Sequence, residues 1–219
     1  MNKLLLIGLL CLSQLQGYGQ KKTETTGKST PFVIGTTETM TSTVLGENRV
    51  LNIYLPEGYN PKDPARYPVI YLLDGSADED FIHVAGLVQY CSFDWIKWLP
   101  KSIVVGIANV DRKRDFTFPS DVPAEKQKYP TTAHSDKFIS FLSEELIPYI
   151  DAHYKTESTK TIIGQSLGGL LATEILMKQP QMFNQYIIIS PSLWWNEGSA
   201  LLLPPAPFPQ GQTTRRIYI

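Results

Sequence analysis

The sequence predicts an α/β fold in which helices cover both faces of a mostly parallel sheet. Short runs that are apolar throughout recur at residues 69–73, 103–108, 162–163 and 186–189. Strands that are apolar on both faces are typical of a parallel sheet that is covered on both sides. Segments with helical spacing of apolar residues lie between these runs. Strand and helix therefore alternate from residue 69 onward, which indicates a doubly wound sheet.

The first residues have the pattern of a signal peptide. Lys3 precedes an uncharged apolar run, Leu4 to Leu12, and small residues then flank Tyr18 as a signal peptidase requires. The run is much shorter than the roughly 20 apolar residues of a membrane-spanning helix. We predict cleavage after residues 1–19, export to the periplasm or the extracellular medium, and no membrane span thereafter. A retained anchor or a core helix is the alternative.

The remaining chain is expected to form a polar linker and one domain. Residues 20–31 are mostly Lys, Thr, Glu, Gly and Ser, with little to bury. Residues 32–45 and 49–55 are rich in Val, Ile and Thr and are separated by a turn at 46–48, which predicts an antiparallel hairpin. Since 219 residues suffice for one sizeable core, residues 32–219 are predicted to be a single domain.

Two helices and a final strand complete the predicted elements. Apolar residues at four-residue steps predict one helix over 136–151, with Ser135 as its N-cap, and another over 167–178. Residues 56–68 contain four prolines and predict a loop. Residues 215–219 predict the start of a further strand. We expect the final strands and a C-terminal helix of the fold to be missing from this chain.

Charge and cysteine content exclude some classes of partner. The net charge is −1, so a basic field for a nucleic-acid backbone is not expected. Cys11 belongs to the predicted signal peptide, which leaves Cys91 alone in the mature chain. A lone cysteine forms neither an internal disulfide nor a cysteine metal cluster. We therefore expect no metal, no nucleic acid and a small buried role for Cys91.

The strongest functional signal is the sequence Gly-Gln-Ser-Leu-Gly at residues 164–168. A serine hydroxyl is a poor nucleophile unless it is exposed, oriented and served by a base. A sharp turn from a strand into a helix exposes the serine, and the flanking glycines leave room for the strained backbone. This motif follows a β-branched run and precedes an amphipathic helix. We therefore predict that Ser166 is a nucleophile, the alternative being a glycine-rich helix cap.

Acyl transfer to a serine also requires donors for the developing oxyanion. The backbone N–H of Leu167 follows the nucleophile directly and is the first candidate. The second is expected from the loop that leaves an earlier strand, where Asp74 precedes Gly75 and Ser76. We favour Ser76 over Gly75, and an ordinary strand-end turn is the alternative.

These motifs occur in an order that resembles a known family. The matching segments are a strand ending in Leu-Leu-Asp-Gly, residues 105–109 followed by two arginines, and residues 141–150, 164–169 and 190–195. The series is similar to the esterase family that contains esterase D, enterochelin esterase and feruloyl esterases, over residues 35–219. The resemblance implies an α/β-hydrolase fold, hydrolysis of carboxylic esters through an acyl-serine intermediate, and no cofactor. It assigns Ser166 as the nucleophile.

The chain departs from the family pattern after the nucleophile. This fold places an acid and then a histidine after the serine, but no histidine and no aspartate follow Ser166 here. Glu197 is a conceivable acid, although a solvated loop glutamate is the simpler interpretation. His83 and His134 are expected near the site, whereas His153 is expected at the opposite edge of the sheet. We expect the usual acid and histidine to lie beyond Ile219.

Two further groups are candidates for substrate binding. Arg112 and Arg114 follow a central strand and could hold a carboxylate or a polar acyl group, or pair structurally with Asp115. Trp194 and Trp195 follow the strand after the nucleophile helix, where aromatic faces stack on sugars or aryl groups. Core packing is their alternative.

The predicted function is therefore hydrolysis of a small-molecule carboxylic ester by a serine hydrolase, as the full-length parent. One alternative is an inactive fragment or a non-catalytic binding protein, because the triad is incomplete. Another is an acyltransferase of the same fold, since transfer needs only an alcohol in place of water. The acyl group, the alcohol and the oligomeric state are not indicated by the sequence.

Overall fold

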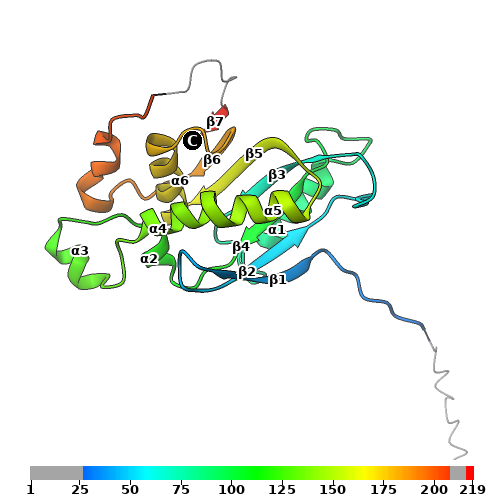
Figure 1. The fold of residues 1–219 in the computed structure, drawn as a ribbon, viewed down its shortest axis with the longest axis horizontal. Helices are drawn as coiled ribbons and strands as arrows, with labels where there is room; N and C mark the ends of the chain where they lie inside the picture. The colour runs from blue at the N-terminus through cyan, green and yellow to red at the C-terminus, as the bar shows by residue number, and fades with distance from the viewer. Residues whose placement is uncertain (1–26, 208–215) are drawn as a thin grey trace, which may run out of the picture. The chain divides into compact units, whose positions relative to one another are not determined.

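The computed structural model describes residues 27–207 and 216–219 of the chain. Its centre is a seven-stranded sheet in the order β1-β2-β4-β3-β5-β6-β7 (Figure 1). The strands are β1 (Thr36–Ser42), β2 (Glu47–Tyr54), β3 (Tyr67–Leu72), β4 (Ile103–Ile107), β5 (Thr156–Gln165), β6 (Gln185–Ile189) and β7 (Arg216–Tyr218). The first pairing and the β2–β4 pairing are antiparallel, and the others are parallel. The predicted fold class, with its N-terminal hairpin, is confirmed.

Helices cover the two faces of this sheet. They are α1 (Phe81–Cys91), α2 (Arg112–Phe116), α3 (Pro123–Lys128), α4 (Ser135–Ser140), the π-helical η1 (Phe141–Leu146), α5 (Ile147–His153), α6 (Leu167–Lys178) and the 3₁₀-helical η2 (Trp195–Leu202). The continuous rod of α4, η1 and α5 crosses one face, and α6 packs on the same face beside it (Figure 1). Helix α1 covers the other face over β2, β3 and β4.

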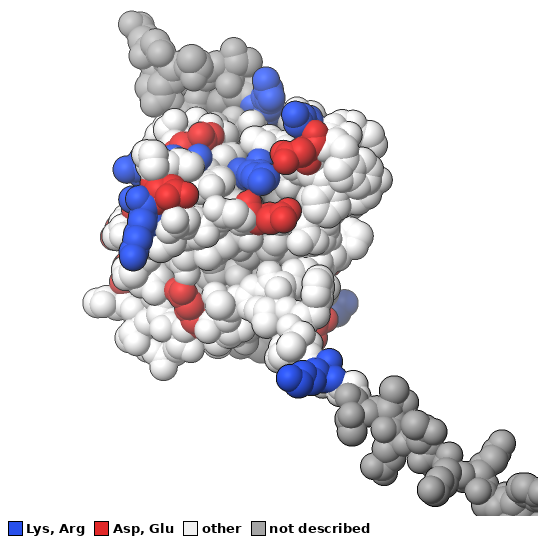
Figure 2. Space-filling view, turned by 90° about the vertical axis from the view of Figure 1, so that its right-hand side faces the viewer, with Lys and Arg blue, Asp and Glu red and all other residues white. Residues whose placement is uncertain are grey.

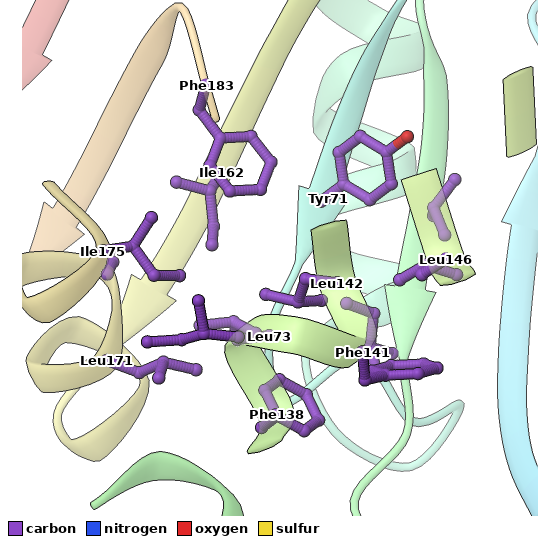
Figure 3. Packing of buried hydrophobic residues seen from close by; sticks show 14 of the residues in the cluster. Tyr71, Leu73, Phe138, Phe141, Leu142, Leu146, Ile162, Leu171, Ile175 and Phe183 are labelled. Carbon is purple, nitrogen blue, oxygen red and sulfur yellow. The ribbon is translucent and has the colours of Figure 1, made fainter. Parts of the chain in front are cut away.

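The core divides between these faces because side chains alternate along each strand. Val69 and Tyr71 of β3 point into the larger cluster with α4, η1 and α6, whereas Ile70 and Leu72 point toward α1. Figure 3 shows side chains from β3, β5, η1 and α6 meeting in the larger cluster. The apolar runs of β3 and β4 are therefore buried on both sides, whereas β5 and β6 are only partly buried on one face and Ile189, at the end of β6, is exposed.

The helix over residues 135–153 differs from its prediction at the start. The helix begins at Ser135, and His134 occupies the N-cap position without a side-chain hydrogen bond, so the prediction of Ser135 as N-cap is wrong. The backbone N–H groups of His134 and Ser135 donate to the carbonyls of Arg114 and Thr117 at 3.1 Å. The N–H of the first helical residue thus finds an acceptor outside the helix, whereas a capping side chain would accept from the second or third helical N–H.

The first hairpin strand is shorter than predicted, because it ends at Ser42. The next two backbone N–H groups, of Thr43 and Val44, donate to the carboxylate of Glu145 on η1 at 2.8 and 3.0 Å. The Ser42 hydroxyl donates to the same carboxylate. These donors are therefore not available for a strand ladder, and they attach the turn to the helix that covers the sheet.

A buried ion-pair network joins the hairpin to α2. Arg49 is fully buried, and its guanidinium lies 2.6 Å from Asp115 and 2.7 Å from Glu47. Arg114 contacts the same two carboxylates, and these hydrogen bonds raise its pKa, chiefly the one to Asp115. The Arg49 guanidinium also lies over the Phe138 ring at 5.2 Å. Because Arg49 and Arg114 share the carboxylates of Glu47 and Asp115, the two positive charges can lie close together.

Several expectations concern surface character and the chain ends. Figure 2 shows acidic and basic residues interleaved on one face of the molecule, in keeping with a net charge of −1. Within the described ranges, no helix has the length and hydropathy to cross a bilayer. The predicted signal peptide and most of the predicted linker lie outside the described residues.

The Arg49 network leads to a stability prediction. We expect Asp115→Ala to lower the free energy of unfolding by about 3–5 kcal/mol, because it removes a buried partner of a fully buried charge. Glu47→Ala, at a carboxylate that is 22% exposed, should cost about 1 kcal/mol. Urea unfolding followed by circular dichroism measures both. Equal losses would show that Asp115 is not the principal counter-ion of Arg49.

Candidate active site

Ser166 lies on a sharp turn between β5 and α6, as the motif predicts. Its φ and ψ are 55° and −115°, a conformation that a residue with a side chain rarely adopts. Its N–H donates to the Ile189 carbonyl at 3.0 Å, and its carbonyl accepts from the N–H of Leu170 at the same distance. The surrounding hydrogen bonds therefore hold the strained residue in place, as in a nucleophile elbow.

The glycines of the motif are explained by close backbone approaches. A Cβ on Gly164 would lie less than 3.0 Å from the carbonyl of Gly168, across the turn. A Cβ on Gly169 would lie 2.9 Å from the Cα of Pro191, in the loop after β6. Only a residue without a side chain lets β5, α6 and this loop approach so closely.

Ser166 opens onto a cavity of about 150 Å³ at the carboxyl edge of the parallel strands. In Figure 1 this edge lies where α2, α3 and the orange segment η2 gather. The cavity is lined by Arg112, Lys113, Thr117, Tyr129, Thr132, Ser166, Leu167, Ser192, Trp194 and Trp195. These residues come from the segments that follow β4, β5 and β6, whose carboxyl ends lie at one edge of the sheet.

The structure separates the two candidates for the second oxyanion donor. The N–H of Gly75 donates to the Ile107 carbonyl at 3.0 Å and is therefore engaged in the sheet. The N–H of Ser76 has only a long contact, 3.4 Å, with the carboxylate of Glu79. Leu167 is the first residue of α6, where an N–H has no partner within the helix. Ser76 and Leu167 therefore remain the candidates, although Ser76 is not among the cavity-lining residues.

The two predicted arginines have different surroundings. Arg112 lines the cavity and makes two hydrogen bonds to Asp74, of 2.5 and 2.9 Å, which raise its pKa. It also donates to the carbonyl of Gln165, next to Ser166, at 3.3 Å. The expected pairing of Arg112 with Asp115 is wrong. Arg114 makes that pairing and does not line the cavity, because Asp115 and Glu47 engage its guanidinium.

The two tryptophans line the cavity in different ways. Trp195 is buried, and its indole N–H donates to the carbonyl of Phe118 at 2.9 Å. Trp194 is 57% exposed and meets Trp195 edge-on, with ring centroids 6.1 Å apart. Trp195 therefore combines core packing with a place in the cavity wall, whereas Trp194 leaves most of its ring available to a ligand.

The candidate acids and bases lie away from the cavity. His83, His134 and His153 are exposed, and none of them lines the cavity. Glu197 is also exposed and outside it, while Glu174 is buried and paired with Lys178. Within the described ranges, the cavity lining contains neither a histidine nor a carboxylate.

Sequence reasoning assigned no role to two residues that the structure places at the elbow. The Ser192 hydroxyl lies 3.1 Å from that of Ser166. The Asp74 carboxylate holds Arg112, and a Cβ on Gly168 would lie 3.2 Å from it. Both residues directly follow parallel strands that flank β5, and carboxyl ends of parallel strands meet at one edge of a sheet. The positions of Asp74 and Ser192 after these strands therefore indicate, from the sequence alone, that both lie near Ser166.

The sheet order, the strained serine turn and the cavity at the carboxyl strand edge define an α/β-hydrolase fold. A family model described as "Putative esterase" matches residues 42–219, and the chain belongs to this family.

Individual relatives agree with this membership. Ferri-bacillibactin esterase BesA of Bacillus subtilis is 33% identical over 78% of this chain and 63% of its own length. A siderophore triacetylfusarinine C esterase of Aspergillus fumigatus is 27% identical over 69% of this chain and 53% of its own. The crystal structure of an IroE-like serine hydrolase from Shewanella oneidensis matches with a TM-score of 0.70 and 34% identity, over 77% of this chain and 54% of that one. The chain thus spans less than two thirds of the length of these relatives.

The close approach at Gly164 can be tested against a second glycine. We expect Gly164→Ala to lower the free energy of unfolding by about 1–3 kcal/mol, because the methyl group overlaps the Gly168 backbone. Gly86→Ala in α1 has open space around the added methyl group. It should stabilise the protein by about 0.5–1 kcal/mol through helix propensity. Denaturant unfolding measures both, and two equally mild changes would contradict the packing argument.

Proposed function

We propose that the protein hydrolyses carboxylic esters, with Ser166 as the nucleophile. The observation that carries this proposal is the strained Ser166 turn, whose side chain opens onto the cavity. In the proposed reaction the Ser166 oxygen attacks the ester carbonyl carbon, and the N–H groups of Leu167 and Ser76 stabilise the oxyanion. The alcohol then leaves, and water releases the acid from the acyl-serine.

Proton transfer in this reaction needs a base in addition to the described cavity residues. A base must come within hydrogen-bond reach of the serine hydroxyl. The three histidines of the chain are exposed and outside the cavity lining, which argues against each of them in this role. The family resemblance implies a histidine base, and we propose that the complete active site includes one.

We further propose that the substrate is a siderophore ester. Two relatives are named as esterases of ferri-bacillibactin and of the siderophore triacetylfusarinine C. The cavity has an exposed aromatic face at Trp194 and the cationic side chain of Lys113, and Arg112, which also lines it, is paired with Asp74. An aromatic face and nearby cations favour an electron-rich aryl group that carries negative charge. Sugar esters and simple acetyl esters do not carry an electron-rich aryl group with negative charge.

Two alternatives remain to be compared with hydrolysis. A non-catalytic binding protein would use the same cavity without forming an acyl-serine. The observation that supports this alternative is that the described cavity lining contains no base. An acyltransferase would form the acyl-serine and pass it to an alcohol. We also propose that the protein is exported, on the strength of the N-terminal sequence alone.

Replacement of the nucleophile tests the mechanism. We expect a fluorophosphonate to label the wild type and not Ser166→Ala, and p-nitrophenyl acetate turnover to be lower in the variant than in the wild type. The oxyanion donors alone support a rate of roughly 10³–10⁴ over water, so slow turnover is expected even without a base. Ser143→Ala, on η1, is the control that should retain labelling. Equal labelling of Ser166→Ala would remove Ser166 from the mechanism.

The aromatic wall of the cavity can be tested by binding without turnover. We expect Trp194→Ala to weaken binding of 2,3-dihydroxybenzoyl-glycine by roughly 3- to 10-fold, because a stacking face is lost. Trp95 is 75% exposed and does not line the cavity, so Trp95→Ala should bind like the wild type. Titration calorimetry measures the dissociation constants. Unchanged binding in Trp194→Ala would contradict the aryl-group proposal.

A further inference from the structure

Ser192 places a second hydroxyl group beside that of the proposed nucleophile. The Oγ atoms of Ser192 and Ser166 are 3.1 Å apart, a distance at which either hydroxyl can donate to the other. Ser192 is only 5% exposed, although it lines the cavity. In the part of the chain that the structure describes, Ser166 is the hydrogen-bond partner of the Ser192 hydroxyl. The Ser192 hydroxyl therefore keeps this hydrogen bond only while the Ser166 side chain points toward it.

Backbone contacts determine the position of Ser192. Its N–H donates to the carbonyl of Ser166 at 2.9 Å, while the N–H of Ser166 donates to the Ile189 carbonyl at 3.0 Å. Between these contacts, Pro191 packs closely against Gly169. A Cβ added to Gly169 would lie 2.9 Å from the Cα of Pro191. The loop after β6 is thus attached to the serine turn on both sides of Pro191. The contact between the two hydroxyls follows from this attachment.

We propose that Ser192 is a positioning residue that holds the Ser166 hydroxyl in the rotamer facing the cavity. If Ser166 adopted another rotamer, the buried Ser192 hydroxyl would lose its partner, and an unsatisfied buried hydroxyl is unfavourable. When Ser166 gives up its proton to a base, the Ser192 hydroxyl keeps its own proton and donates to the Ser166 oxygen. Donation to the charged form favours that form. This role rests on the proposed function of Ser166.

The contact can be measured without any ester hydrolysis. In the full chain carrying Ser166→Cys, the pH dependence of iodoacetamide alkylation gives the pKa of the introduced thiol. Peptide-resolved mass spectrometry distinguishes this thiol from Cys11 and Cys91. A hydroxyl that donates to the thiolate lowers its pKa, so we expect Ser192→Ala to raise that pKa by roughly one pH unit.

The charged groups near the turn are the same in all of these variants. Arg112 and Lys113 line the cavity, and the Asp74 carboxylate lies beside Gly168. A difference in pKa between variants at residue 192 therefore reports the hydroxyl and not a change in these charges. Ser102→Ala is the control, because Ser102 is another buried serine whose hydroxyl donates to the carbonyl of Pro100 instead. It should leave the thiol pKa unchanged.

A second pair of variants separates the hydroxyl from the volume of the side chain. Ser192→Thr keeps a hydroxyl and Ser192→Val has nearly the same shape without one, so the thiol pKa should be higher in Ser192→Val. If the valine variant does not fold, as judged by circular dichroism, the comparison of Ser192 with Ser192→Ala decides. Equal thiol pKa values in Ser192 and Ser192→Ala would overturn the proposal.

Fluorophosphonate labelling of chains that keep Ser166, compared with the thiol pKa values, distinguishes this proposal from the proposed function. If Ser192→Ala shifts the thiol pKa while fluorophosphonate labels wild type and Ser166→Ala equally, the contact stands and hydrolysis through Ser166 is refuted. If the pKa is unchanged while labelling requires Ser166, the nucleophile stands and Ser192 has no positioning role. In the expected case, Ser192→Ala also slows fluorophosphonate labelling of Ser166, and Ser192→Thr labels faster than Ser192→Val.

Discussion

The close approach of β5, α6 and the loop after β6 is the constraint on which the candidate site depends. Gly164 and Gly168 face each other across the serine turn, and Gly169 faces Pro191, at separations that leave no room for a side chain. The hydrogen bond from Ser166 to Ile189 then ties the turn to the neighbouring strand. A positive φ at a serine is unfavourable by itself. This backbone conformation persists here because the close packing and the hydrogen bonds on both sides of the turn exclude other conformations.

Two separate charge networks extend this arrangement outward from the turn. Asp74, after β3, holds Arg112, which in turn donates to the carbonyl of Gln165 beside Ser166. Arg49 and Asp115 form the buried contact between the hairpin and α2, the short helix that carries Arg112. The hairpin at the far edge of the sheet therefore supports the cavity wall through α2. Removing a charge from either network would alter the position of loops as well as the local electrostatics.

The fold and the position of the strained serine turn could be predicted because both leave local signals. The apolar runs and the Gly-x-Ser-x-Gly spacing depend on near neighbours in the chain, and α6 begins and ends where predicted, at Leu167–Lys178. The arginine pairings could not be assigned, because Asp74 lies 38 residues from Arg112 and the choice depends on which loops meet. The error at Ser135 has the same origin, since the start of the helix depends on contacts of His134 and Ser135 with carbonyls of a distant segment.

Ser166 must lose a proton in the proposed reaction, whereas the groups described around it do not accept one. The described lining supplies one N–H candidate, that of Leu167, together with cations and aromatic faces, all of which act on charge or shape without accepting a proton. Ser192 belongs to this group, since a hydroxyl can orient an oxygen but is too weak a base to activate it. In the proposed function, the groups that bind an ester and stabilise its oxyanion are thus distinct from the group that accepts the proton. A serine held by backbone strain and a neighbouring hydroxyl is ready to be activated, and the base then determines whether binding leads to hydrolysis.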